Sequence, residues 1–403
     1  MAAAAHDHSH ETVRNPGPYE ISSRGKALIL LCIAIGVAAF LAGLSVDAKR
    51  TWTAFLINHF YFLSLAMGGL FIAAVQWLTS AMWSAPVRRI SESFVAYLPI
   101  AAVLTIVLYF GLDKVYLWTD TALMHRDLAL IPKIHWLTSG FFTVRNVVFI
   151  LIWILFAKIL IGGSIVQDTT RDAKITLRNR ALSAVFMVVF ALTYTLASFD
   201  LMMSMDPYWY STIFGVYCFA GLFYSSLALT CIVTLFLRER RLLDGIVSED
   251  HLHDLGKFMF AFTIFWAYIG FAQFLLIWYA NMPEETLYFI HRFHNGWFYI
   301  SCFLLFGKFM VPFFLLLPRD AKRDDRMLWI VGIFMLIAQW IDVMWMVQPE
   351  IFTEGPRLGW IEIGEFLGFL GLFGVAVSRF LAKHNIVAIG DPKLAQAVFH
   401  HHQ

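Results

Sequence analysis

Two aspartates inside apolar stretches are the residues of this chain whose setting points most directly to chemistry. Asp200 and Asp342 each stand seven residues before a proline, Pro207 and Pro349, with methionines in between. A carboxylate inside a bilayer is costly unless it is paired or hydrated, and such groups often serve proton or substrate paths. We expect a proton or quinol site at both. The alternative is a pair of carboxylates near the membrane surface that only hydrogen-bond across helices.

Other polar side chains inside apolar stretches are predicted to form an outer and an inner layer. Arg145 lies at a similar depth to Asp200 and could pair with it, whereas Glu362 and Glu365 share one face of a helix. The alternatives are snorkelling of long side chains to the headgroups and polar packing within the bundle. The proton-path candidates beside the two aspartates are, in the outer layer, His59, Arg145, Glu362 and Glu365, in the inner layer Lys158 and Lys308, and between the layers Tyr194.

The elements that must position these groups are membrane-spanning helices. Of the 403 residues, 60% are apolar and 14% are charged, with mean hydropathy +0.69 and net charge +2. These values exclude a soluble enzyme, a disordered chain and a nucleic-acid module. A run of about 20 apolar residues crosses the hydrocarbon layer as a helix. Ten such runs occur, at 26–46, 53–80, 90–112, 141–164, 180–204, 211–237, 256–280, 295–317, 327–348 and 360–382.

The two aspartate segments indicate an internal repeat. They are 142 residues apart, which corresponds to four spans and therefore preserves direction. We predict an all-α integral membrane protein with ten transmembrane helices, in which spans 2–5 and 6–9 form two four-helix bundles flanked by spans 1 and 10. The predicted organisation is an N-terminal tail over 1–25, a membrane domain over 26–382 and a C-terminal tail over 383–403.

The loops predict the orientation. Of the 30 Lys and Arg residues, 19 fall on the side of the termini and 7 on the opposite side. The excess of positive charge places both termini, and hence both tails, in the cytoplasm.

The sequence offers no means of binding a redox metal. The four cysteines lie in apolar stretches without a CxxC motif, and His59 is the only histidine clearly within a span. A bis-histidine haem and an iron–sulfur cluster both need several converging ligands. We therefore expect no metal and no cofactor bound by this chain, apart from a possible quinone such as menaquinone.

Two long stretches carry a resemblance to a known family. Residues 198–217, SFDLMMSMDPYWYSTIFGVY, and residues 271–285, FAQFLLIWYANMPEE, closely resemble the F subunit of bacterial alternative complex III. The ten-span pattern is similar to the wider membrane-anchor family of polysulfide and dimethyl-sulfoxide reductases. The resemblance extends over essentially the whole chain.

The resemblance implies a membrane subunit of a quinol:cytochrome c (or high-potential carrier) oxidoreductase in a respiratory or photosynthetic electron-transport chain of a bacterial cytoplasmic membrane. It implies partners: a C-type ten-span subunit, an iron–sulfur subunit, cytochrome c subunits and small membrane subunits. Haem c and iron–sulfur clusters would then lie in those partners, with lipids around this chain and no nucleic acid. It also implies proton translocation or bracing of the assembly. Our own hypothesis for such a path is that Lys158 and Lys308 mark the inner entry. His135 and Asp200 lie near the outer side, where the family places quinol oxidation.

Three alternatives remain open at this stage. The chain could bind and oxidise quinol, act as a pure scaffold, or work as an independent secondary transporter. The missing inverted repeat argues against a transporter. A scaffold does not need Asp200, Asp342, Lys158 and Lys308 in the bilayer, so substituting them separates a scaffold from a proton path.

Overall fold

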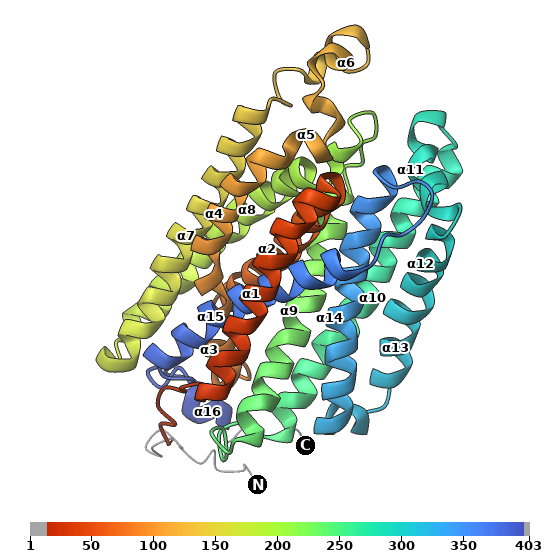
Figure 1. Ribbon diagram of the computed structural model, residues 1–403. Helices are drawn as coiled ribbons and strands as arrows, with labels where there is room; N and C mark the ends of the chain where they lie inside the picture. The colour runs from red at the N-terminus through yellow and green to blue at the C-terminus, as the bar shows by residue number, and fades with distance from the viewer. Residues whose placement is uncertain (1–13, 399–403) are drawn as a thin grey trace.

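The computed structural model describes residues 14–398, and over that range its regular elements are all helices, without strands. Ten helical segments are long and apolar enough to cross a membrane, as predicted (Figure 1). The chain is therefore a multi-pass membrane protein. Six segments are single helices that cross without interruption: α1 (Ser23–Val46), α2 (Ala48–Leu78), α7 (Ser139–Thr170), α9 (Phe214–Glu239), α10 (Glu249–Ala280) and α15 (Trp360–Lys383).

The other four segments have interruptions or short extensions. The fifth is α8 (Ala173–Leu201) with a short extension to Met205. The third combines α3 (Ala85–Ser93), α4 (Leu98–Leu108) and α5 (Leu112–Val115). The eighth combines α12 (Trp297–Phe303), a π-helical turn at Leu304–Met310 and α13 (Val311–Leu316). The ninth is α14 (Asp325–Val347) with a short extension to Glu350. Short helices α6 (Thr121–Arg126) and α11 (Pro283–Phe293) lie in the connections, and α16 (Leu394–Val398) follows the tenth span.

The helices define two sides of the molecule. We call the side where α1 begins and α15 ends the terminal side, and the opposite side the distal side. In Figure 1 α6 and α11 lie at the distal side, and α16 lies at the terminal side. Several helices start before the predicted boundary, for example α8 at Ala173 and α10 at Glu249. Their first turns are polar, so hydropathy alone places the boundary too late.

The predicted pair of four-helix bundles is present. The first bundle consists of α2, α3–α5, α7 and α8, and the second of α9, α10, α12–α13 and α14. The two bundles meet where α2 packs against α9 and α14, and where α8 packs against α9. Nearly every residue of α2 is buried as a result. The core of the protein is thus the seam between the bundles, lined by aromatic and small side chains.

Spans 1 and 10 pack against each other on the outside of α2. Their crossing depends on glycine, because a Cβ on Gly36 would lie 2.2 Å from the Cα of Gly368. Ala39 and Gly364 make a similarly close contact one turn along. Small residues let helix backbones approach closely, and this geometry is common inside membranes. The contact fixes α15, and with it Glu362 and Glu365, against the first bundle.

Candidate functional site

The first candidate site is a buried ion pair in the second bundle. Lys308 Nζ lies 2.6 Å from Asp342 Oδ2, and the two residues are 0% and 1% exposed. The hydroxyl of Tyr217 donates to Asp342 Oδ1 at 2.6 Å, and Trp266 Nε1 donates to Oδ2 at 3.2 Å. The carboxylate is therefore held by three donors from three helices, α9, α10 and the π-helical turn. Buried charges of this kind persist only when paired and hydrogen-bonded.

The ammonium of Lys308 has further partners besides the aspartate. It donates to Gln339 Oε1 at 2.7 Å and lies 4.0 Å from the ring centre of Trp266. The π-helical turn that carries Lys308 replaces regular α-helical geometry, and such turns are frequent at functional sites. The backbone carbonyl of Lys308 accepts a hydrogen bond from Tyr224 Oη at 3.2 Å. The amine thus keeps polar and aromatic neighbours when its bond to Asp342 changes.

The second candidate site is the matching ion pair in the first bundle. Arg145 donates to Asp200 through Nε and Nη2, both at 2.7 Å, which confirms that these two residues pair. Trp136 Nε1 and Asn146 Nδ2 add hydrogen bonds of 3.2 Å and 3.1 Å to the same carboxylate. The guanidinium also stacks 3.9 Å from the ring centre of Trp136. A planar fork matched to a carboxylate gives a rigid, strongly oriented pair.

The two ion pairs occupy related places in the two bundles. In each bundle the aspartate lies on the fourth helix and its cation on the third, and an indole N–H donates to the carboxylate. The two bundles therefore share a buried ion pair between their third and fourth helices, in addition to the same order of helices. The register differs, since Arg145 lies in the second turn of α7 whereas Lys308 lies midway along its span.

The predicted division into two layers is wrong for Lys308. This residue bonds directly to Asp342 and so belongs to the distal layer. Lys308 is eleven residues from the start of its span and Asp342 eight residues from the end of its own. The two residues therefore differ in depth by three residues, or about 4.5 Å of rise along a helix. The four methylenes of the lysine side chain are long enough to span this difference. Lys158 lies about 20 Å along α7 from Arg145 by the same rise, and its side chain is exposed.

The two glutamates of α15 have different surroundings. Glu362 accepts from Arg50 Nε at 2.6 Å and Nη2 at 2.7 Å, and it also caps the helix through Gly359 N. Glu365 is 2% exposed, and neither carboxyl oxygen has a hydrogen-bond partner. It lines a cavity of about 230 Å³ between α1, α2, α4 and α15. Glu362 is thus a structural ion pair, whereas Glu365 is an unpaired acid in an apolar setting.

His59 and Tyr194 occupy the core away from both ion pairs. His59 Nε2 is 3.0 Å from Thr105 Oγ1, and its Nδ1 has no partner. Tyr194 Oη is 3.0 Å from Ser64 Oγ and donates to Cys218 O at 3.5 Å. Tyr194 therefore links α8 to α2 and α9 at the seam between the bundles. Neither residue contacts Asp200 or Asp342.

A cavity opens beside Asp200 on the distal side. Its volume is about 280 Å³, and Lys133, Trp136 and Trp209 line it together with the aspartate. His135, which was predicted to join Asp200 at a quinol site, is exposed and does not line this cavity. Lys133 donates to Pro207 O at 2.5 Å, and burial lowers the pKa of its ammonium. The indole of Trp136 and the ammonium of Lys133 thus take the place expected for His135.

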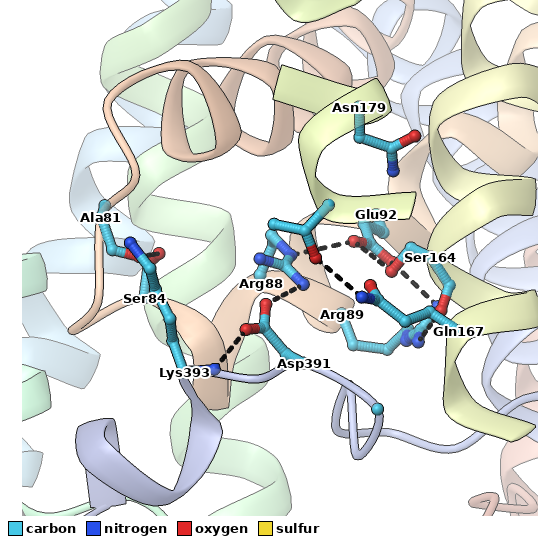
Figure 2. Close-up of polar contacts among 12 residues, drawn as sticks. Ala81, Ser84, Arg88, Arg89, Glu92, Ser164, Gln167, Asn179, Asp391 and Lys393 are labelled. Atoms are coloured by element: carbon cyan, nitrogen blue, oxygen red, sulfur yellow. Dashed lines mark hydrogen bonds and ion pairs between the residues drawn. The ribbon is translucent and has the colours of Figure 1, made fainter. Parts of the chain in front are cut away.

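A charged cluster on the terminal side was not predicted. Arg88 contacts Glu92 at 3.2 Å and Asp391 at 2.6 Å, while Arg89 contacts Glu92 at 3.0 Å and Asp168 at 2.8 Å. Figure 2 shows Glu92 and Asp391 on either side of the Arg88 guanidinium. Arg89 and Glu92 are completely buried. The spacing of Arg88 and Arg89 from Glu92, four and three residues, was the available signal, because such pairs share one helix face.

The segment after α15 completes this cluster. It folds back so that Asp391 reaches Arg88, and Gly390 N donates to Asp168 at 3.3 Å. Gly390 is required there because a Cβ would lie 1.9 Å from Gln167 O. Ile386, Val387 and Ala388 are buried. The described part of the predicted C-terminal tail is therefore packed against α3 and α7.

Comparisons with known proteins give no further assignment. No family model matches the chain, and no curated protein matches it significantly. Within residues 14–398, no group of three or more His, Cys, Asp and Glu side chains is arranged to hold a metal ion. The geometry of the ion pairs and cavities therefore carries the functional argument.

Proposed function

We propose that this protein is a membrane subunit of a quinol:cytochrome c (or high-potential carrier) oxidoreductase, in which it holds and conducts protons and braces the complex. The Lys308–Asp342 pair is the observation that carries this proposal. A scaffold needs apolar surfaces and gains little from a buried ion pair, which well-packed apolar residues often replace without loss of stability. Ionisable groups kept inside a membrane usually serve proton or ion movement.

The chemistry at this pair is a change of protonation on the carboxylate. A proton that reaches Asp342 neutralises it and weakens its bond to Lys308. The amine then keeps Gln339 and the face of Trp266 as partners. Loss of the proton restores the pair. The hydroxyl of Tyr217 donates to Asp342 Oδ1 and so lies next to the carboxylate that exchanges the proton.

The setting of the subunit follows from the two stretches that resemble the F subunit of alternative complex III. In this proposal the C-type ten-span subunit, the iron–sulfur subunit and the cytochrome c subunits carry the haem c groups and clusters. The chain lies in a bacterial cytoplasmic membrane with its terminal side in the cytoplasm, in line with the excess of Lys and Arg there. The distal side, with both ion pairs, then faces the outer aqueous phase.

The test uses the intact complex in sealed liposomes, with quinol-driven cytochrome c reduction and proton movement recorded together. We expect Asp342→Asn to retain electron transfer and to lower proton movement. The matched control is Asp113→Asn, which removes an exposed carboxylate. Unchanged proton movement in Asp342→Asn, with normal assembly, contradicts the proton role and leaves a brace.

A second candidate function is quinol binding at the Asp200 cavity. The observation that favours it is the cavity of about 280 Å³, in which an aspartate, an indole and an ammonium converge. Asp200→Asn in the same liposome assay separates the two functions. Loss of both electron transfer and proton movement, in a complex that still assembles, favours a quinol site there.

A further inference from the structure

Another cavity lies in the second bundle, away from the Asp200 cavity. It measures about 530 Å³ and is bounded by α10, α11 and the eighth span on the distal half of the molecule. This volume falls within the range of small-molecule sites, about 300–1,000 Å³. Its walls include Trp266, Gln273, Tyr288, Phe289, Cys302 and Trp345.

One polar group in this wall lacks a partner. Gln273 is only 4% exposed, and its Nε2 has no hydrogen-bond partner. A buried amide N–H left without an acceptor costs about 1–3 kcal/mol. The cavity therefore offers an unused donor in an apolar wall, and this arrangement suits a ligand that brings one acceptor oxygen.

The remaining walls favour a flat ring over an acyl chain. Two indoles, the phenol of Tyr288 and several phenylalanines face the cavity. Aromatic side chains gain specific stacking and edge contacts with another ring, beyond the area they bury. Bilayer-facing side chains such as Phe271 and Phe298, 61% and 48% exposed, also line the cavity, so a ligand dissolved in the membrane can reach it.

The cavity shares its wall with the ion pair of the second bundle. Tyr217 and Trp266 line it, and the polar ends of the same two side chains donate to Asp342. The ring of Tyr217 packs on Gly270, where a Cβ would lie 3.3 Å from a ring carbon. Trp266, Gly270 and Gln273 lie on one face of α10, so the same cavity extends from Gln273 to the donors that hold the carboxylate.

We propose that this cavity binds a membrane quinone, with the quinone carbonyl accepting from Gln273 Nε2 and the ring lying among Trp266, Tyr288 and Trp345. This site is separate from the Asp200 cavity in the first bundle. The proposal deepens the proposed function, and it rests on that function for the choice of a quinone as the ring. It concerns binding only and includes no electron transfer at this position.

The test is photolabelling of the full chain, within its complex, in nanodiscs prepared without quinone. The probe is an azido-benzoquinone with a short alkyl tail, and labelled peptides are mapped by mass spectrometry. We expect labels within 266–274 and 298–309, and at least a fivefold reduction by excess decyl-benzoquinone. Gln273→Leu should lower this labelling about two- to tenfold, the effect of one hydrogen bond.

Two further variants keep the result decisive. Gln76→Leu is the matched control, because Gln76 is another buried glutamine with an unpaired amide atom, placed on α2 away from the cavity. It should leave labelling unchanged. Cys302→Phe fills the cavity and should abolish the label even where Gln273→Leu fails to fold. Labelling that excess decyl-benzoquinone does not reduce, or that added phospholipid reduces equally, overturns the proposal in favour of a lipid groove.

The labelling result is distinguishable from the fate of the proposed function. Competed labelling together with normal proton movement in Asp342→Asn contradicts the proton role and leaves the quinone site. Absent labelling together with lowered proton movement contradicts the quinone site and leaves the proton role.

Discussion

Glu362 and Glu365 lie one turn apart on α15, yet only Glu362 has a cation. Arg50 binds both oxygens of Glu362, whereas both oxygens of Glu365 are buried without a partner. Two acids of the same helix face therefore have opposite effects on stability. The first ties α2 to α15 at the distal side, and the second places a polar group in an apolar cavity.

Replacing Glu365 with leucine should stabilise the protein. The change removes an unpaired buried carboxyl group, whose burial costs about 1–3 kcal/mol. Thermal unfolding in detergent measures the effect as a rise in Tm. Glu362→Leu is the matched control and should lower Tm, because it leaves Arg50 without its partner. A lower Tm for Glu365→Leu would show that the carboxyl group has a bound partner in the membrane.

Replacing only one member of the Lys308–Asp342 pair should destabilise the protein more than replacing both. Lys308→Met or Asp342→Leu alone leaves one buried charge uncompensated, at a cost of about 3–5 kcal/mol. The double variant removes both charges and should recover a large part of that loss. A double-mutant cycle on unfolding measures the coupling. Additive losses in the double variant would mean that the two groups do not interact in the folded protein.

Arg145→Lys should destabilise the first bundle although the charge is conserved. Lysine cannot donate through two fixed N–H groups to Asp200 or stack flat on Trp136. The expected loss is about 1–3 kcal/mol, the value of a charged hydrogen bond and its packing. Unfolding of Arg145→Lys is compared with that of Arg126→Lys, an exposed arginine of α6. Equal stability of the two variants would contradict the bidentate geometry.

Gly368→Leu should separate α1 from α15. A Cβ at Gly368 would lie 2.7 Å from the Cα of Gly36, so the helix backbones must move apart, at about 1–3 kcal/mol. The rate of maleimide labelling of Cys32 on α1 measures the separation and should rise. Gly374→Leu is the control on the same helix, since its Cβ meets only the side chain of Ile29 at 3.6 Å. Equal labelling in both variants would rule out this close contact.

His291 should make stability depend on pH. The pKa of His291 is raised above its ordinary value of 6.5, and the hydrogen bond to Glu350 is the largest cause. Burial lowers this pKa, whereas the charge of Glu350 raises it. The contribution is therefore fully present below about pH 6.5 and is lost as pH rises through the folded-state pKa. His291 is 34% exposed, so screening limits the effect to a few tenths of a kcal/mol.

The measurement for His291 is Tm from about pH 5 to about pH 9 for the wild type and His291→Asn. The difference between them should shrink as pH rises. His125→Asn, at an exposed histidine of α6, is the matched control. A difference that grows with pH would mean that the neutral imidazole is the form bound to Glu350.

The sequence predicts the ten helices well because hydropathy depends on composition rather than on packing. It also indicates that Arg145 and Asp200 could pair, since their depths follow from helix counting. Lys308 was placed too far from Asp342 because counting Cα positions ignores the reach of a long side chain. His135 was predicted from its place near the outer side, and only the fold shows that Trp136, one residue further on, lines the cavity beside Asp200.

The charged cluster on the terminal side and the cavity in the second bundle could not be predicted from the sequence, for different reasons. Arg88 and Arg89 stand at the edge of an apolar run, where charged residues are usually solvated. Their burial depends on a segment about 300 residues further along the chain. The cavity around Gln273 results from how α11 and the helices of the second bundle pack, and no local pattern in the sequence encodes an empty volume.

The contact between Arg88 and Asp391 has a consequence for the order of synthesis. Arg88 enters the membrane with the third span, long before the ribosome has made Asp391. Until then its guanidinium has Glu92, which Arg89 shares, as its ionic partner, and the ring of Trp77 as an aromatic one. The bundle is closed by a segment translated after the tenth span. The Arg88–Asp391 contact therefore distinguishes a finished chain from a nascent one at the terminal side of the first bundle.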